Sequence, residues 1–310
     1  MSALNKGVTT RVAAAEYLAA IAAARLAGVK PYLSSGLDSV DAKFPAWLHN
    51  GHLVTLAGRP GQGKTALAQQ IAEHVARDGK KSVFFFSLEM PAGELVARSV
   101  TRTGRVDATA LKLDTLTPDQ ELVRDRAVAR FAGLPLTIFT CRQIDAILKA
   151  VADGVKDLAA AGAPPLGLIV VDYLQKIEGK GADLKTIVSA NTAALKQLAV
   201  AQGVPMLALA QLNRNATGRS DPRPIQSDLK ESGTIEAESD LVLYVYREDE
   251  AKPEADIGTL KVRHIPDGVQ TVNFDGKYIT FGDKQPSSGQ LSLVESDSTS
   301  RRTPRGQRAL

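Results

Sequence analysis

The sequence predicts an α/β fold, with a mostly parallel central sheet that helices cover on both faces. Short apolar runs of strand length alternate with helical patterns along most of the 310 residues. A glycine-rich turn joins the first long apolar run to an amphipathic helical pattern. Polar residues stand where several apolar runs end. Parallel sheets bind their ligands at those strand ends, so these residues are the first candidates for a site.

The expected elements follow an alanine-rich helix at residues 9–27, with Thr9 or Thr10 as its cap and Gly28 at its end. Strands are expected at 53–57, 82–86, 136–139, 166–171, 205–210, 241–246, 258–263, 269–274 and 278–281. Helices are expected after the glycine-rich turn, from Pro91 to about 131, and at 143–161 and 184–202. Strands that alternate with helices in this way favour a parallel sheet.

Three segments divide the chain. We expect a linker helix in 1–34, the α/β domain in 35–283 and a disordered basic tail in 284–310, which has little to bury. Five basic and two acidic residues in the tail account for +3 of the formal net charge of +4. The nearly neutral domain argues against general adhesion to nucleic acid, although it allows a local basic channel.

The composition is that of a soluble globular protein, with 44% hydrophobic and 23% charged residues. No apolar run approaches the ~20 residues that span a bilayer. Arg11, Glu16 and Arg25 interrupt the N-terminal alanines, so neither a membrane partner nor a signal peptide is expected. The single cysteine excludes an intramolecular disulfide and suits a reducing cytoplasm. With only four histidines, a structural zinc site is not expected.

A phosphate-binding loop is the strongest local signal. The pattern G-x-x-x-x-G-K-T and the residue after it are formed by Gly58, Arg59, Pro60, Gly61, Gln62, Gly63, Lys64, Thr65 and Ala66. Glycines let several backbone N–H groups point into one concavity, and the helix that follows adds its positive end. Lys64 is then expected to reach the β- and γ-phosphates, and Thr65 to be a Mg²⁺ ligand. The strand before the loop and the helix after it favour this interpretation over an ordinary glycine-rich turn.

Three polar residues at other strand ends are candidate partners of the nucleotide. Asp172 closes the run LGLIVVD and is expected to hold Mg²⁺ opposite Thr65, with a capping carboxylate as the alternative. Glu89 follows the neighbouring strand, where it either activates the attacking water or balances a helix dipole. Gln211 either contacts the γ-phosphate and its water or holds the next loop in shape.

Two cations and two loops suit contacts beyond the chain's own nucleotide. Lys261 and Arg263 stand two apart on an expected strand, so both side chains leave the same face. They suit a phosphate from elsewhere, as a finger acting in trans, or form a solvated strand face. The loops 176–183 and 213–230 contain glycines and basic residues but no aromatic platforms. They are either sequence-independent phosphate contacts or mobile solvated loops.

Several segments together resemble the DnaB-type replicative helicases. In the order found in that family they are GRPGQGKTALA, FFFSLEM, LIVVDYLQ, GVPMLALAQLNR, RPIQSDLKESGTIEAESDLVLYVYRE and LKVRHIPDGVQTVNFDGKY. The resemblance covers about residues 35–283. It implies a RecA-like P-loop NTPase fold with ATP and Mg²⁺ as cofactors. It also implies a homo-oligomer, a hexameric ring that moves 5′ to 3′ on single-stranded DNA and unwinds duplex.

The resemblance also implies roles by position. The implied catalytic residues are Lys64, Glu89, Asp172, Gln211, Lys261 and Arg263, and the residues expected to contact DNA are Arg214, Lys230, Glu231 and Gly233. Among these, Glu89 is the implied catalytic base and Gln211 the γ-phosphate sensor that is coupled to the DNA loop. Lys261 and Arg263 are the implied trans-acting lysine and arginine finger.

The sequence departs from the family pattern in three places. Lys230 stands where the family usually has arginine, which keeps the charge but loses bidentate phosphate geometry. Arg263 is followed by His264-Ile265-Pro266 in place of Asn-Gly-Pro. The primase-binding N-terminal domain is missing, so only helix 9–27 stands where the family has its linker helix, and we expect it to pack on a neighbouring subunit.

These departures keep other functions open. The alternatives are a helicase loader or primase-recruiting ATPase, and a RecA- or RadA-like recombinase. Primase or a loader are the candidate protein partners beside other copies of the chain. A phage or mobile-element origin fits a helicase without the primase-binding domain, so the expected location is the cytoplasm of a bacterium or of its infected cell.

Overall fold

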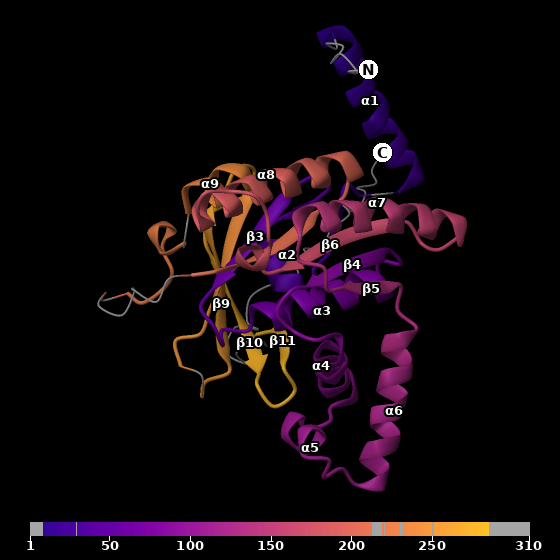
Figure 1. Ribbon diagram of the computed structural model, residues 1–310, viewed down its shortest axis with the longest axis vertical. Coiled ribbons are helices and arrows are strands. Elements are labelled where there is room, and N and C mark those ends of the chain that lie inside the picture. Colours follow the sequence, from indigo (N-terminus) through magenta and orange to yellow (C-terminus); the bar gives the residue numbers. More distant parts are fainter. Residues whose placement is uncertain are drawn as a thin grey trace, which may run out of the picture.

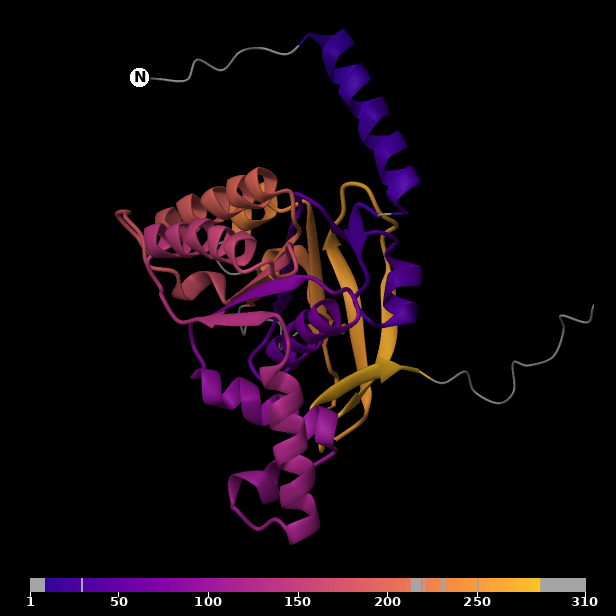
Figure 2. The same cartoon turned by 90° about the vertical axis from the view of Figure 1, so that its right-hand side faces the viewer.

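A nine-stranded sheet organises the part of the chain that the computed structural model describes, which is residues 9–28, 30–212, 219, 221–229, 232–249 and 251–284 (Figure 1). The strand order is β11-β10-β9-β8-β3-β7-β6-β4-β5. The strands are β3 (Leu53–Gly58), β4 (Ser82–Ser87), β5 (Leu136–Phe139), β6 (Leu166–Asp172), β7 (Met206–Gln211), β8 (Leu241–Tyr246), β9 (Glu254–Lys261), β10 (Val269–Asp275) and β11 (Thr280–Asp283). Helices cover both faces of this sheet, which confirms the predicted architecture (Figure 2).

The strands from β8 to β5 run parallel to one another, and β9, β10 and β11 continue the sheet as an antiparallel meander. The parallel strands therefore end at one side of the sheet, the carboxyl edge, and begin at the opposite side, the amino edge. Gly58 pairs with Gln211, and Ser87 pairs with Asp172. This register brings the predicted strand-end residues to the carboxyl edge.

The central strands are buried on both faces, which explains their continuous apolar runs. Every residue of β3, β4 and β8 is buried. On one face, α3 (Lys64–Arg77) contributes Leu67, Ile71 and Val75 to the core, as their spacing predicts. The other face is covered by α7 (Ile144–Ala160), α8 (Leu184–Gln202) and α9 (Ser232–Glu238).

Two helical parts extend from opposite ends of the sheet (Figure 1). One contains α4 (Ala92–Gly104), α5 (Ala108–Lys112) and α6 (Pro118–Ala132), which enclose a small apolar cluster of their own. The other is α1 (Thr10–Ala27), which confirms the helix expected at 9–27 and exposes Leu18 and Leu26. No described helix is long and apolar enough to cross a bilayer.

Several short elements are absent from the sequence-based expectation. They are β1 (Tyr32–Leu33), β2 (Leu48–His49), α2 (Asp38–Lys43), α9 and the 3-10 turns η1 (Leu174–Lys176) and η2 (Gln226–Asp228). The case of α2 shows why. The Asp283 carboxylate accepts hydrogen bonds from the backbone N–H groups of Asp38 and Ser39, both at 3.0 Å. A cap that comes from the far end of the chain leaves no local sequence signal.

The expected strand at 258–263 is wrong at both ends. The observed strand, β9, begins at Glu254 because its first residues pair with β10, from Asn273 opposite Glu254 to Val269 opposite Gly258. It ends at Lys261, so Arg263 lies beyond the strand. The inference that Lys261 and Arg263 share a strand face is therefore incorrect, although their side chains do converge on a neighbouring helix.

Candidate active site

The glycine-rich loop connects the end of β3 to the start of α3, as the motif predicts. Gly61 and Gly63 both have positive φ angles, of 80° and 95°, which glycine adopts without strain. A Cβ on Gly58 would lie 3.0 Å from the carbonyl oxygen of Val245, and one on Gly63 would lie 3.0 Å from the ring of Phe281. The turn therefore needs glycine for close packing as well as for backbone freedom.

Lys64 begins α3 and lies largely buried beside the loop that it is expected to serve. Its ammonium donates a hydrogen bond of 2.9 Å to the carbonyl oxygen of Arg59. Burial lowers the pKa of Lys64 to about 8, against the opposing effect of the Asp172 and Glu89 carboxylates. An anion in the adjacent cavity would restore the charged form, because opposite charges favour ionisation.

Thr65 and Asp172 meet across the gap between α3 and β6. The Thr65 hydroxyl donates a hydrogen bond of 2.7 Å to Oδ2 of Asp172, which is 3% exposed. Burial raises the pKa of Asp172, although the Thr65 hydrogen bond and the Lys64 charge act in the other direction. Two hard oxygen donors in contact suit Mg²⁺, which keeps most of its ligands as water or phosphate oxygens. The described residues contain no cluster of three His, Cys, Asp or Glu that could cage a metal by themselves.

A cavity of about 580 Å³ opens at the carboxyl edge. Its walls are formed by Pro60, Gly61, Gly63, Lys64, Thr65, Ala66, Glu89, Met90, Pro91, Glu94, Arg98, Asp172, Tyr173, Gln211, Phe274 and Ile279. These walls include four of the six predicted catalytic residues, which are Lys64, Glu89, Asp172 and Gln211, and the predicted metal ligand Thr65. All five come from the carboxyl edge or from the turn beside it. This is the convergence that a parallel sheet with these strand ends predicts.

Some of the predicted residues of this edge make structural contacts instead of lining the cavity. The Arg59 guanidinium donates a hydrogen bond of 3.3 Å to the carbonyl oxygen of Pro222. The Gln62 side chain accepts a hydrogen bond from the backbone N–H of Arg247. Gln211 is held by Gln175, which contacts the Gln211 backbone N–H at 3.2 Å and its carbonyl oxygen at 3.4 Å. The loop is thus tied to the chain that follows the sheet's central strands.

Arg98 is the cavity residue that the sequence analysis misses. It lies on α4, is half-buried, and makes no hydrogen bond or ion pair with any residue that the structure describes. Burial lowers the pKa of its guanidinium, and Asp172 and Glu94 act against this. A partly desolvated cation without a close partner suits a phosphate. The available signal was its place on the helix that follows Glu89, one turn after Glu94.

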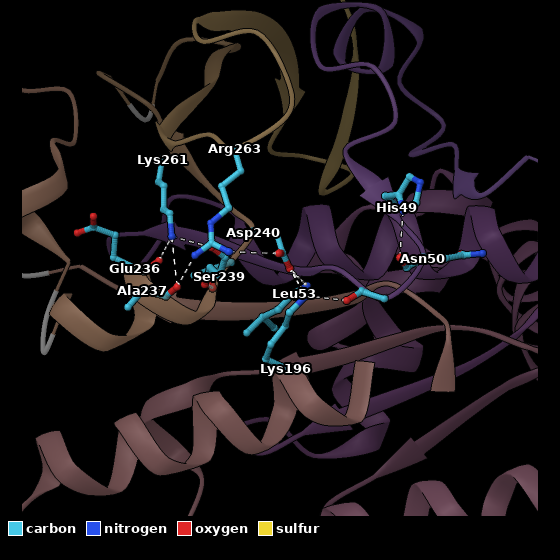
Figure 3. Close-up of polar contacts among 12 residues, drawn as sticks. His49, Asn50, Leu53, Lys196, Glu236, Ala237, Ser239, Asp240, Lys261 and Arg263 are labelled. Carbon is cyan, nitrogen blue, oxygen red and sulfur yellow. Dashed lines mark hydrogen bonds and ion pairs between the residues drawn. The ribbon is translucent and has the colours of Figure 1, made fainter. Parts of the chain in front are cut away.

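Lys261 and Arg263 lie at the amino edge, away from the cavity. Lys261 pairs with Val242 at the start of β8, where the parallel strands begin. Both side chains point to the C-terminal end of α9 (Figure 3). Lys261 donates to the carbonyl oxygens of Glu236, Ala237 and Ser239, and Arg263 donates to that of Ala237 at 2.7 Å. In one chain, therefore, neither cation contributes to the cavity beside Lys64.

The predicted DNA contacts fall mostly outside the described residues. Arg214, Lys230 and Glu231 lie there, and Gly233 is exposed in the first turn of α9. The described chain just before this turn is anchored by two ion pairs. Arg219 contacts Asp228, and Arg223 contacts Asp256 at 3.0 Å. These pairs fix residues 221–229 against the body of the protein.

Residues 33–283 match the family described as the DnaB-like helicase C-terminal domain. The chain belongs to this family. It is 34% identical over 258 residues to the replicative DNA helicase DnaB of Pasteurella multocida, and 33% identical over 259 residues to that of Geobacillus stearothermophilus. Each match covers 80% of this chain, but only 55% and 56% of the relative. The chain therefore spans about half the length of these DnaB proteins.

Solved structures support the same fold for this DnaB-like domain. A structure described as an isolated ATPase domain matches 87% of this chain and 98% of its own length, with a TM-score of 0.76 and 24% identity. A DnaB-like replicative helicase matches 87% of this chain and 68% of its own, with a TM-score of 0.77 and 24% identity. The RadB recombinase gives a TM-score of 0.51. The RecA-like fold implied by the sequence resemblance is confirmed.

Proposed function

We propose that this DnaB-like domain is an ATP-driven DNA helicase motor. The observation that carries the proposal is the meeting of Lys64, Thr65, Glu89, Asp172 and Gln211 around one cavity in a member of this family. Phosphate-binding, metal-binding and water-activating groups thus face the same space. The reaction is hydrolysis of the γ-phosphate of ATP, and its free energy drives movement along single-stranded DNA.

Each cavity residue has a distinct part in the proposed hydrolysis. Lys64 and the backbone N–H groups of the glycine-rich loop bind the phosphates, and Phe274 and Ile279 supply an apolar wall for the base. Thr65 and Asp172 would hold Mg²⁺, which neutralises the charge that develops on the phosphates. Glu89, exposed at the rim of the cavity, takes the proton of the attacking water.

The same proposal places Lys261 and Arg263 in the site of a neighbouring chain. A cation that cannot reach its own cavity is useful to hydrolysis only if another copy presents its nucleotide to it. The amino-edge position of the pair supports this arrangement. A ring of identical chains, a hexamer by family resemblance, supplies such a neighbour at every site, and α1 with its exposed Leu18 and Leu26 is a candidate contact.

The DNA side of the proposal rests on the turn that leads into α9. Arg214, Lys230, Glu231 and Gly233 are the proposed contacts to the DNA backbone, with 5′ to 3′ movement by family resemblance. Primase or a helicase loader are the proposed protein partners, since one of the similar structures is described with its primase interactions. The proposed location is the cytoplasm of a bacterium or of a phage-infected cell.

A forked-duplex unwinding assay, run beside a phosphate-release assay, tests this function. We expect the purified chain to release phosphate from ATP with Mg²⁺ and to separate the strands. Glu89→Gln should abolish both activities, and Glu121→Gln on the exposed face of α6 should change neither. Strong ATP hydrolysis without strand separation would favour a loader or scaffold. Helical filaments on DNA in electron micrographs would favour a recombinase, and no phosphate release would refute the motor.

A further inference from the structure

The C-terminal end of α9 occupies every hydrogen-bond donor of the Lys261 ammonium. Its three acceptors are the carbonyl oxygens of Glu236, Ala237 and Ser239 (Figure 3). The last carbonyl groups of a helix have no partners within the helix and attract cations. An ammonium has three N–H donors and no more. In this arrangement Lys261 has none left for a phosphate of another chain.

Arg263 is held at the same place by a backbone acceptor and a carboxylate. One terminal nitrogen donates to the Ala237 carbonyl oxygen at 2.7 Å, and the other lies 3.8 Å from Oδ1 of Asp240. Asp240 is itself fixed, because its Oδ2 accepts hydrogen bonds from the backbone N–H of Leu53 at 2.8 Å and from Lys196 at 2.7 Å. The carboxylate thus stands between two cations, with Lys196 the closer one.

The acceptor side of this arrangement is anchored to the sheet. Ser239 follows α9, and its hydroxyl donates to the Ile235 carbonyl oxygen and contacts the Thr55 hydroxyl at 2.7 Å. The backbone N–H of Asp240 donates to the carbonyl oxygen of Leu53. The end of α9 therefore does not simply follow the two cations if they move. Engagement of another chain has to break the contacts of Lys261.

We propose that the end of α9 and Asp240 form a resting bracket for Lys261 and Arg263, which has to open before the pair can act on a neighbouring nucleotide. Asp240 is a positioning residue, and Lys196 weakens its hold on Arg263 by competing for the same carboxylate. This inference rests on the trans role proposed above. The bracket also shares α9 with the predicted DNA-contacting turn, since Gly233 lies in the first turn of that helix. DNA bound at the turn therefore acts on the helix that holds the pair.

Two substitutions should change ATP turnover in opposite directions, measured without DNA. Asp240→Asn keeps an acceptor for Leu53 but removes the charge that holds Arg263, so we expect DNA-free turnover to rise about threefold and stimulation by single-stranded DNA to shrink. Lys196→Met leaves Asp240 with Arg263 as its remaining cation, so DNA-free turnover should fall. A merely structural role would lower activity in both variants. Equal directions, or no change in either, would overturn the bracket.

A folding defect is separated from this result by a double variant. Asp240→Asn alone leaves Lys196 without its anion, and Lys196→Met with Asp240→Asn removes both members of that pair. We expect the double variant to melt close to the unchanged protein and to show the raised DNA-free turnover of Asp240→Asn. A folded double variant with unchanged turnover would contradict the proposal.

An amine-labelling experiment tests the bracket independently of hydrolysis. Burial lowers the pKa of Lys261, so an accessible Lys261 would react faster with an acylating reagent than the exposed Lys252. The bracket predicts the reverse, with Lys261 labelled about threefold more slowly in the free chain, as followed by peptide mass spectrometry. Equal or faster labelling would sink the bracket even if the chain proves to be an active helicase. Slow labelling in a chain without ATP hydrolysis would instead indicate failure of the proposed function.

Discussion

Lys64 and Lys261 are two partly buried lysines that the fold uses in opposite ways. Burial lowers the pKa of each of them. Lys64 makes one hydrogen bond, to the Arg59 carbonyl oxygen, and lines a cavity of about 580 Å³. Lys261 makes three, all to the end of α9. The carboxyl edge is thus ready for a ligand within one chain, and the amino edge is closed on itself. The difference favours a hydrolysis site that is completed between chains.

Removing the cavity lysine gives the largest expected effect. Lys64→Ala deletes the cation that faces the β- and γ-phosphates, and we expect ATP turnover to fall by about 100-fold or more. Nucleotide affinity should fall with it, because Lys64 contacts the phosphates in the ground state as well. Phosphate release and equilibrium nucleotide binding measure the two effects. Lys149→Ala, an exposed lysine on α7, is the control, and turnover of Lys64→Ala within threefold of the control would show that the cavity is not the site.

Removing the amino-edge arginine should separate binding from turnover. Arg263→Ala leaves the chain's own cavity intact, so nucleotide affinity should stay within about threefold while turnover falls by about 100-fold. Mixing Arg263→Ala with Glu89→Ala chains should restore part of the activity, because some interfaces then pair an intact cavity with an intact arginine. Absence of any rescue in mixed assemblies would argue that the pair acts within its own chain or not at all.

The two edges also differ in how far the sequence predicts them. Lys64, Asp172 and Gln211 follow from apolar runs and strand ends, because parallel strands must end on the same side. The surroundings of Lys261 depend on where β9 stops and on α9, which has seven residues and no clear local signal. Arg98 enters the cavity only through the way α4 packs. Local patterns therefore predict the elements and one edge, whereas the contacts of the other edge depend on tertiary pairing.

The missed cavity residue supplies a test of intermediate size. Arg98→Met keeps most of the length and apolar volume of the side chain and removes its charge. We expect nucleotide affinity to fall about tenfold, because a charge-assisted contact to phosphate is worth about 1.5–3 kcal/mol. The melting temperature should not fall, since Arg98 makes no hydrogen bond or ion pair within the described chain. Arg126→Met on the exposed side of α6 is the control. A large loss of stability without a loss of affinity would assign Arg98 to folding instead.

The smallest expected effect comes from the pKa of Lys64, which burial lowers to about 8 in the nucleotide-free chain. Below that pH the ammonium is charged and can pair with phosphate, and above it binding must first take up a proton. Nucleotide affinity should therefore fall about fourfold between pH 7 and pH 8.5, as the charged fraction falls. Affinity is the right measurement, because the pKa of Lys261 is lowered too and its titration would alter turnover. Lys64→Met should bind weakly but with little dependence on pH in this range. If the unchanged protein is equally insensitive, Lys64 is charged throughout, and the contrast between the two lysines lies in their hydrogen bonds alone.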